Sequence, residues 1–197
     1  WLGAYRTQSE AQVFRNKYRI QAFEPQQNWQ GPYYGLDFGF ANDPTAGVEC
    51  YISDNKLYIN KECGKVGLEL DATAPHVLRH MPDANKHTIR ADSARPESIS
   101  YLKRHGLPKI TGVKKGKGSV EDGIEFMKSF HEIIIHPDCK QVASEFRLYS
   151  YKTDRLSGDV LPVLMDEHNH WIDAARYALE PIMRKRGSFK QTSIRMI

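Results

Sequence analysis

The sequence predicts an α/β protein, in which a mixed β-sheet carries helices on both of its faces. Two observations lead to this fold class. In the first third of the chain, three apolar segments alternate like strands, and the turns between them are so short that neighbouring strands must be antiparallel. Further along, short apolar strands alternate with amphipathic helices, a pattern typical of parallel strands whose connecting helices cover a sheet.

The three antiparallel strands are predicted from their alternation and from the turn residues between them. The turns are Asn42-Asp43-Pro44 and Asp54-Asn55, and residues of these types commonly end strands. The strands cover residues 33–40, 45–53 and 56–63. The first strand carries Asp37 in its middle. Because strand interiors usually exclude Asp and burial of a carboxylate is unfavourable, Asp37 needs a positively charged partner.

The later elements are predicted from a change in the apolar period. The predicted helices cover residues 70–81, 98–105, 119–130, 139–151 and 169–179, and Pro181 is expected to end the last of them. The predicted strands cover residues 87–91, 107–113 and 132–136, with a turn or hairpin at 154–160 and a return strand at 161–165. Three antiparallel strands followed by this alternation are the layout of a ribonuclease H-like sheet, with the first strand beside the fourth.

Both ends of the chain are predicted to lie outside the main domain, which covers residues 31–184. Residues 1–30 are polar and rich in Gln, and we expect a short helix over 11–20 followed by a linker. Residues 185–197 are basic and are predicted to form a poorly ordered tail. Because the chain opens at Trp1 without a Met, we expect it to be a piece of a longer protein.

Composition narrows the class of protein. The chain has 197 residues, 40% of them hydrophobic and 26% charged, which is enough for one domain with a real core. We find no apolar run of about eighteen residues and therefore predict no membrane span. The net charge of +4 permits a polyanionic partner without requiring one. The three cysteines form no C-x-x-C pair, which argues against a disulfide framework or a zinc knuckle and fits a cytosolic compartment.

Three aspartates lie between small or apolar residues, and the predicted fold brings them together. They are Asp37 in the first strand, Asp92 after the fourth strand, and Asp173 in a late helix laid against the same end of the sheet. Three neighbouring carboxylates repel one another and raise each other's pKa values. Two divalent cations resolve this conflict, and hard oxygen ligands of this kind suit Mg²⁺ or Mn²⁺.

Two residues upstream of Asp173 are further candidates for the same site. His170 lies three residues before Asp173, so the two side chains share one face of the predicted helix. His170 is therefore a candidate to orient water or to transfer a proton. Asp166 lies four residues before His170 and is an accessory candidate, although it precedes the predicted helix.

Each of these residues also has an ordinary structural interpretation. Asp37 can be a turn or capping residue, and Asp92 can cap the helix that follows it. Asp173 can complement the dipole of its own helix from the first turn. His170 can be a solvated residue at the start of a helix.

A basic loop is a candidate for contact with nucleic acid. Residues 114–118 read Lys-Lys-Gly-Lys-Gly, and we call this segment, with Lys114, Lys115 and Lys117, the lysine loop. Its glycines allow it to follow a phosphate backbone, while the alternative is a solvated turn. Arg95, three residues after Asp92, is a candidate either for a phosphate contact or for a salt bridge.

Three motifs resemble a known family. They are G-L-D-F-G-F with D-P-T-A at 35–46, A-D-S-A-R-P-E-S at 91–98, and D-E-H-N-H-W-I-D-A-A-R-Y-A-L at 166–179. With these motifs the chain resembles, over roughly residues 31–184, the nuclease domain of the large terminase subunit of tailed bacteriophages of the headful-packaging type. The resemblance implies a ribonuclease H-like fold in which Asp37, Asp92 and Asp173 bind two Mg²⁺ or Mn²⁺ ions, with His170 as an accessory group.

The resemblance also implies an activity and partners. The expected reaction is two-metal hydrolysis of double-stranded DNA, with little sequence specificity, during viral genome packaging in the cytoplasm of the host cell. The expected partners are DNA, the portal, the small terminase subunit and an upstream ATPase domain. The ATPase half of the family is not represented in this sequence, since it contains no G-x-x-x-x-G-K-[ST] motif.

Two rival functions remain open at this point. The first is a nucleic-acid-binding module on the same fold that does not use metal ions. The second is another ribonuclease H-like nuclease, such as a junction resolvase or a ribonuclease H. A metal-dependent cleavage assay distinguishes the terminase-like nuclease from the non-catalytic module. The preference of the enzyme among duplex, junction and RNA–DNA hybrid substrates distinguishes it from the other nucleases.

Overall fold

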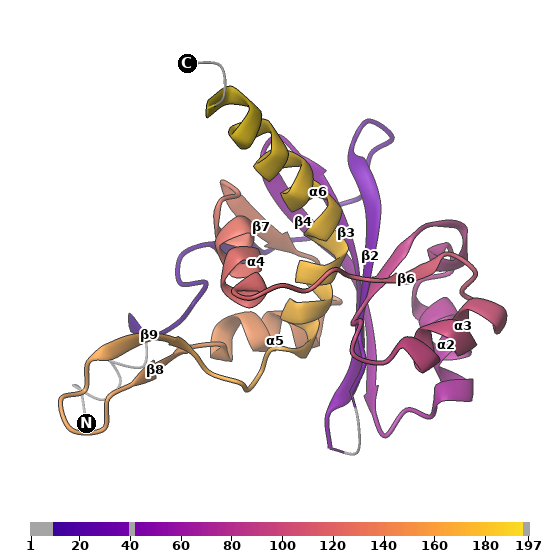
Figure 1. Cartoon of the computed structure of the whole chain (residues 1–197), viewed down its shortest axis with the longest axis horizontal. Coiled ribbons are helices and arrows are strands. Elements are labelled where there is room, and N and C mark those ends of the chain that lie inside the picture. Colours follow the sequence, from indigo (N-terminus) through magenta and orange to yellow (C-terminus); the bar gives the residue numbers. More distant parts are fainter. Residues whose placement is uncertain (1–9, 40–41, 195–197) are drawn as a thin grey trace.

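The computed structural model describes residues 10–39 and 42–194, with side chains described as far as residue 185. Its main sheet has seven strands in the order β1-β7-β4-β3-β2-β5-β6 (Figure 1). The strands are β1 (Tyr18–Ile20), β2 (Gln30–Asp37), β3 (Pro44–Ser53), β4 (Lys56–Val66), β5 (Ile89–Ala91), β6 (Ile110–Gly112) and β7 (Glu132–Ile135). The strands β2, β3 and β4 are antiparallel neighbours, while β5 and β6 continue the sheet in parallel beyond β2 and β7 pairs in parallel with β4. The predicted mixed sheet is therefore confirmed.

Helices cover both faces of the sheet, as predicted (Figure 1). The helices are α2 (Leu70–His80), α3 (Pro96–Arg104), α4 (Ser119–Lys128), α5 (Lys140–Leu148) and α6 (His170–Ile194), with a short 3₁₀ turn η1 (Ala84–Lys86). The helices α2 and α3 pack on one face, and α4, α5 and α6 pack on the other. A small hairpin of β8 (Tyr151–Thr153) and β9 (Val160–Leu164) projects from the end of α5, which agrees with the predicted hairpin.

The side chains of β2 alternate between the two faces of the sheet, so this strand packs against helices on both sides. Tyr34 and Leu36 are 1% exposed and belong to the core cluster beneath α2 and α3. Gly35 and Asp37 point to the opposite face, where α6 packs. The strand ends at Asp37, so this carboxylate lies at the end of the strand and not in its middle, and Phe40, the last residue of the predicted strand, lies outside the described residues.

The helix predicted over residues 11–20 is wrong. Residues 11–17 form turns, apart from an isolated bridge between Gln12 and Ser150, and β1 adds a parallel strand to β7 at the edge of the sheet. Asn16 has a φ of 57°, which interrupts a right-handed helix. Val13 and Phe14 are instead buried in the core on the α6 side, so their apolar spacing reflects packing against the sheet and not a helical face.

The prediction that Pro181 ends the last helix is also wrong. Helix α6 continues through Pro181 to Ile194, and residues 185–194 are helical although we expected a poorly ordered tail there; residues 195–197 lie outside the described part of the chain. An internal Pro removes one backbone hydrogen bond and weakens a helix. Packing around it favours continuation, since Leu179 is 1% exposed and Ile182 contacts the core cluster. Over the described residues, no helix has the length and apolar character needed to cross a membrane.

Candidate active site

Asp37 and Asp92 lie side by side at the carboxyl ends of two parallel strands. Leu36 in β2 pairs with Ala91 in β5, and the backbone N–H of Asp92 donates to the carbonyl oxygen of Leu36 at 3.0 Å. Asp37 directly follows Leu36, and Asp92 directly follows Ala91. Ligand sites in open α/β sheets commonly lie at this edge, and the register therefore confirms the predicted proximity of the two carboxylates.

Helix α6 brings Asp173 to the same edge because it lies directly on β2. A Cβ atom on Gly35 would fall 1.8 Å from the carbonyl oxygen of Ala174, so only glycine allows the helix backbone to approach the strand this closely. Ala174, Ala175 and Ala178 are fully buried at the contact. This packing holds the first turn of α6, with Asp173, over the end of β2.

The three carboxylates act on one another electrostatically. Asp37 is 8% exposed, and burial is the largest cause of its raised pKa. The negative charges of Asp173 and then Asp92 raise this pKa further, while the hydrogen bond with His170 lowers it. The neighbourhood predicted for Asp37, Asp92 and Asp173 is therefore present in the fold.

Each of the three carboxylates contacts a nitrogen-bearing side chain. Asp92 Oδ1 lies 2.5 Å from Lys115 Nζ, and Asp173 Oδ1 accepts a hydrogen bond of 2.9 Å from Arg176 Nε. Asp37 Oδ2 lies 3.4 Å from Nδ1 of His170. Within residues 10–39 and 42–194, no three His, Cys, Asp or Glu side chains are already gathered as ligands of one ion. The three carboxylates have the oxygen donors that Mg²⁺ and Mn²⁺ prefer, so the residues fit such ions chemically once these side-chain contacts are exchanged.

His170 lies between two carboxylates at the start of α6. Its Nδ1 faces Asp37, and its Nε2 lies 3.6 Å from Oδ1 of Asp43. The hydrogen bond with Asp37 is the largest cause of the raised pKa of His170, and burial opposes it. The structure thus places His170 beside Asp37, while its predicted role beside Asp173 stays a prediction.

The start of α6 is fixed by a residue that sequence reasoning missed. Glu145 in α5 is 6% exposed, and its carboxylate accepts hydrogen bonds from the backbone N–H groups of His170, Trp171 and Ile172 at 3.0, 2.8 and 3.1 Å. These are N–H groups that the first turn of a helix cannot satisfy itself. Nothing in the local sequence marks Glu145 for this role, because its partners lie about 25 residues away.

A second missed residue, Tyr177, lies one turn after Asp173. It is 4% exposed, and burial raises its pKa, with further contributions from the charges of Asp37, Asp173 and Asp92. Lys115 Nζ lies 5.3 Å from the centre of its ring. The i, i+4 spacing from Asp173 is the one sequence signal that could have identified it.

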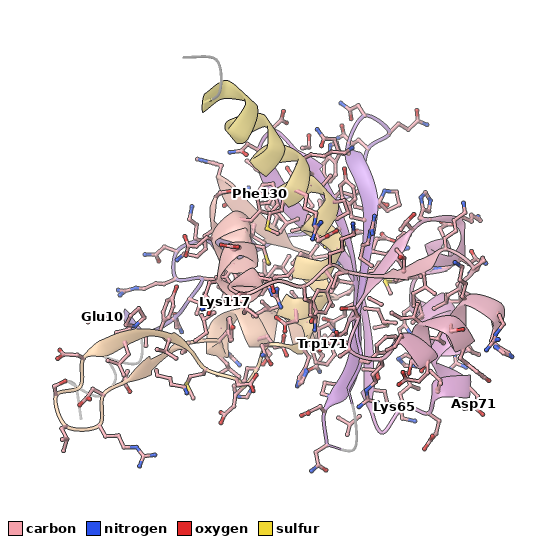
Figure 2. The ribbon with its side chains drawn as sticks, in the orientation of Figure 1. Glu10, Lys65, Asp71, Lys117, Phe130 and Trp171 are labelled. Atoms are coloured by element: carbon pink, nitrogen blue, oxygen red, sulfur yellow. The ribbon has the colours of Figure 1, made fainter. Side chains whose placement is uncertain are left out.

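The remaining candidates are distributed around the site. Asp166 accepts a hydrogen bond from Asn169 and lines a cavity of about 500 Å³ together with Asp43 and His170. Arg95 lines a different cavity, of about 320 Å³. In the lysine loop, all three lysines are exposed, and Figure 2 places Lys117 beside α4, on the α6 side of the sheet. Lys115 contacts Asp92, a member of the triad formed by Asp37, Asp92 and Asp173.

The order of the sheet, with carboxylates from β2, β5 and the overlying helix, defines the class as a ribonuclease H-like nuclease fold. The nuclease domain of the large terminase of bacteriophage SPP1, solved with bound Mn, has a TM-score of 0.74 and 35% identity, covering 84% of this chain and 96% of that one. The P22 large terminase nuclease domain has a TM-score of 0.66 at 18% identity, covering 88% and 92%. The predicted fold is confirmed by these similarities.

Residues 37–181 match the family described as the terminase RNase H-like domain, and the chain belongs to this family. It is 40% identical over 157 residues to the large terminase subunit of Bacillus phage SPP1, covering 78% of this chain and 36% of that protein. It is 29% identical over 148 residues to the PBSX phage terminase large subunit of Bacillus subtilis (strain 168), covering 74% and 33%. The chain thus spans about a third of the curated relatives it matches, and the resemblance drawn from the three motifs is confirmed.

Proposed function

We propose that this chain is a metal-dependent endonuclease that cuts double-stranded DNA, with little sequence specificity, during viral genome packaging. The observation that carries the proposal is the convergence of Asp37, Asp92 and Asp173 at one edge of the sheet. The SPP1 relative that was solved with bound Mn supports the choice of metal.

The three aspartates would hold two divalent ions, Mg²⁺ or Mn²⁺. Bound ions of this kind supply an activated water and stabilise the charge that develops on the leaving oxygen of a phosphodiester. The carboxylate oxygens of Asp37, Asp92 and Asp173 would hold the ions, and Asp37 is the least exposed of the three side chains, at 12% against 16% for each of the others.

Other side chains would position the substrate and move protons. His170 can hold a proton at the nitrogen that faces Asp37 and release it to the reacting groups. Asp166 has an accessory place in the cavity beside His170. The lysine loop and Arg95 would contact phosphates, and such contacts position a duplex without reading its sequence.

The wider assignments follow from the family and are part of the same proposal. We place the nuclease domain at residues 31–184, with 1–30 as an extension and 185–197 as a basic tail. In the longer protein we expect an ATPase domain upstream, with the portal and the small terminase subunit as partners, acting in the cytoplasm of the host cell. A large terminase from a thermophilic bacteriophage, similar in fold at 19% identity, has been solved in complex with ADP.

Cleavage of a supercoiled plasmid tests the proposed function. The wild-type chain should nick or linearise the plasmid with Mn²⁺ or Mg²⁺ and leave it intact in EDTA. Asp37→Ala, Asp92→Ala and Asp173→Ala should each abolish cleavage while circular dichroism shows a folded protein. Metal-independent binding without cleavage would favour the non-catalytic module, and stronger cleavage of junctions or RNA–DNA hybrids would favour the resolvase or ribonuclease H alternative.

A further inference from the structure

Lys115 forms an ion pair with Asp92, one of the three aspartates that the proposed function assigns to metal binding. Its Nζ lies 2.5 Å from Asp92 Oδ1, the same oxygen that accepts the backbone N–H of Ala94 at 2.8 Å. The side chain of Asp92 is 16% exposed and that of Lys115 is 40% exposed. The ammonium group is therefore held at a carboxylate on the margin of the site, with solvent on its other side.

The lysine loop is fixed at its two ends and open in its middle. Arg184 Nη2 donates to the carbonyl oxygen of Lys114 at 3.0 Å, and Arg176 Nη1 donates to that of Ser119 at 3.1 Å. Between these points, a Cβ on Gly116 or Gly118 would meet no atom within 4 Å. The middle of the loop is therefore not packed against the protein at either glycine, while both of its ends are bound to α6.

An ammonium group and a divalent cation oppose each other at Asp92. Both are positively charged, and two cations on one carboxylate lie close enough to repel each other, although Lys115 contacts only Oδ1. A lysine displaced from Asp92 remains close to the site because its loop is anchored, and a phosphate of bound DNA is the anion that the proposed reaction would bring to the same place. Lysine commonly binds phosphate as a point charge.

We propose that Lys115 and the catalytic metal compete for Asp92, and that metal binding transfers Lys115 from Asp92 to a phosphate of the DNA. This inference rests on the proposed function. In this scheme metal binding favours DNA binding and DNA binding favours metal binding, because each removes the contact between Lys115 and Asp92. Coupling of this kind is reciprocal between the two ligands.

The first test measures Mn²⁺ affinity in the absence of DNA by titration calorimetry on the wild type, Lys115→Ala and Lys117→Ala. Lys117 is the matched control, since it is a lysine of the same loop that makes no ion pair with a carboxylate among the described residues. Loss of a partly exposed ion pair should raise the Mn²⁺ affinity of Lys115→Ala roughly twofold to fivefold, while Lys117→Ala should stay near the wild type. Equal affinity in the two variants would overturn the competition.

The second test measures duplex DNA binding in EDTA. Asp92→Asn should bind DNA more tightly than the wild type, because Lys115 is released without metal. Asp92→Asn should add no such gain when it is introduced into Lys115→Ala, and should add the same gain when it is introduced into Lys117→Ala, with each double variant compared with its single lysine variant. A gain that survives the removal of Lys115 would reflect the lost negative charge alone and would refute the transfer.

Mn²⁺ binding and DNA cleavage by the wild type distinguish a failure of the proposed function from a failure of the Lys115 inference. If the wild type neither binds Mn²⁺ nor cuts DNA, the proposed function fails and this inference fails with it. If the wild type cuts DNA with Mn²⁺ but Lys115→Ala and Lys117→Ala have the same Mn²⁺ affinity, the inference alone is overturned.

Discussion

The carboxylate of Glu145 accepts a hydrogen bond of 2.8 Å from the backbone N–H of Trp171, and this contact joins helix α5 to the first turn of helix α6. A similar contact lies one step earlier in the fold. Glu62 in β4 accepts hydrogen bonds from the backbone N–H groups of Gln141 and Val142 at the start of α5. Glu62 thus links the sheet to the start of α5, and Glu145 links α5 to the start of α6. Together they fix the position of the first turn of α6, which carries Asp173.

Replacement of Glu145 by Ala should destabilise the domain. It would leave buried N–H groups of His170, Trp171 and Ile172 without their acceptor, and each such loss typically costs about 1–3 kcal/mol. We expect urea unfolding to show a fall in stability within or above this range. Glu125→Ala, at an exposed position of α4, should change stability far less.

The same residue predicts a pH dependence of stability. Burial raises the pKa of Glu145 to about 7, against an ordinary value of 4.5, although the backbone N–H donors oppose this shift. The folded state therefore binds this proton more tightly than the unfolded state, so the contribution of Glu145 is complete below pH 4.5 and is lost as the pH rises to about 7. The change is of the order of 3 kcal/mol, since one pKa unit corresponds to about 1.4 kcal/mol.

Comparison with Glu145→Gln isolates this effect, because Gln keeps an acceptor and does not titrate. The stability of the wild type relative to Glu145→Gln should fall between about pH 5 and pH 7.5, measured by urea unfolding at each pH. A difference that is constant across this interval would contradict the prediction.

Gly35→Ala should separate α6 from β2. Because the new Cβ would lie 1.8 Å from a backbone oxygen of Ala174, either the helix or the strand must shift. Overpacking of this kind costs about 1–3 kcal/mol and occasionally more, and a clash with backbone belongs to the upper end. We expect a large loss of stability in urea and a loss of Mn²⁺-dependent cleavage. Gly116→Ala is the control, since its Cβ meets no atom within 4 Å, and it should unfold like the wild type.

The sequence predicted the parts of this site that depend on local pattern. Asp37 and Asp92 follow short apolar strands, and His170 and Asp173 share a helix face, so their neighbourhood followed from strand order and helical spacing. The contacts of Glu145 and Lys115 could not be predicted in this way, because they join segments whose distance in space is set by tertiary packing. The same limit explains β1, where Val13 and Phe14 have a spacing compatible with a helix but pack against the sheet.

Asp37→Asn should stabilise the metal-free domain. The substitution removes a buried carboxylate that lies near the charges of Asp173 and Asp92. Burial and these two charges raise the pKa of Asp37, so its ionised form is unfavourable in the folded state. The variant should therefore melt at a higher temperature than the wild type in EDTA at neutral pH. Addition of Mn²⁺ should raise the melting temperature of the wild type and have a smaller effect on Asp37→Asn, because an ion that binds the folded state stabilises it in proportion to RT ln(1 + [L]/Kd).

Asp138→Asn provides the control for this experiment, since its side chain is 89% exposed and lies outside the triad. It should melt like the wild type with and without Mn²⁺. If Asp37→Asn also melts like the wild type in EDTA and gains equally from Mn²⁺, then Asp37 belongs to no metal site.

Replacement of all three lysines of the lysine loop by Ala should weaken binding to duplex DNA regardless of its sequence. The three side chains are exposed, Lys115 contacts Asp92, and Figure 2 places Lys117 on the α6 side of the sheet. Neutralised phosphates release counterions when lysines bind them. The slope of log affinity against log salt should become shallower by about 0.9 for each phosphate that the variant no longer neutralises. A triple Ala variant of Arg79, Lys103 and Arg104, on the α2 and α3 face, removes the same charge and should keep the wild-type slope. Equal slopes for the two triple variants would mean that the lysine loop acts only through net charge and does not touch DNA.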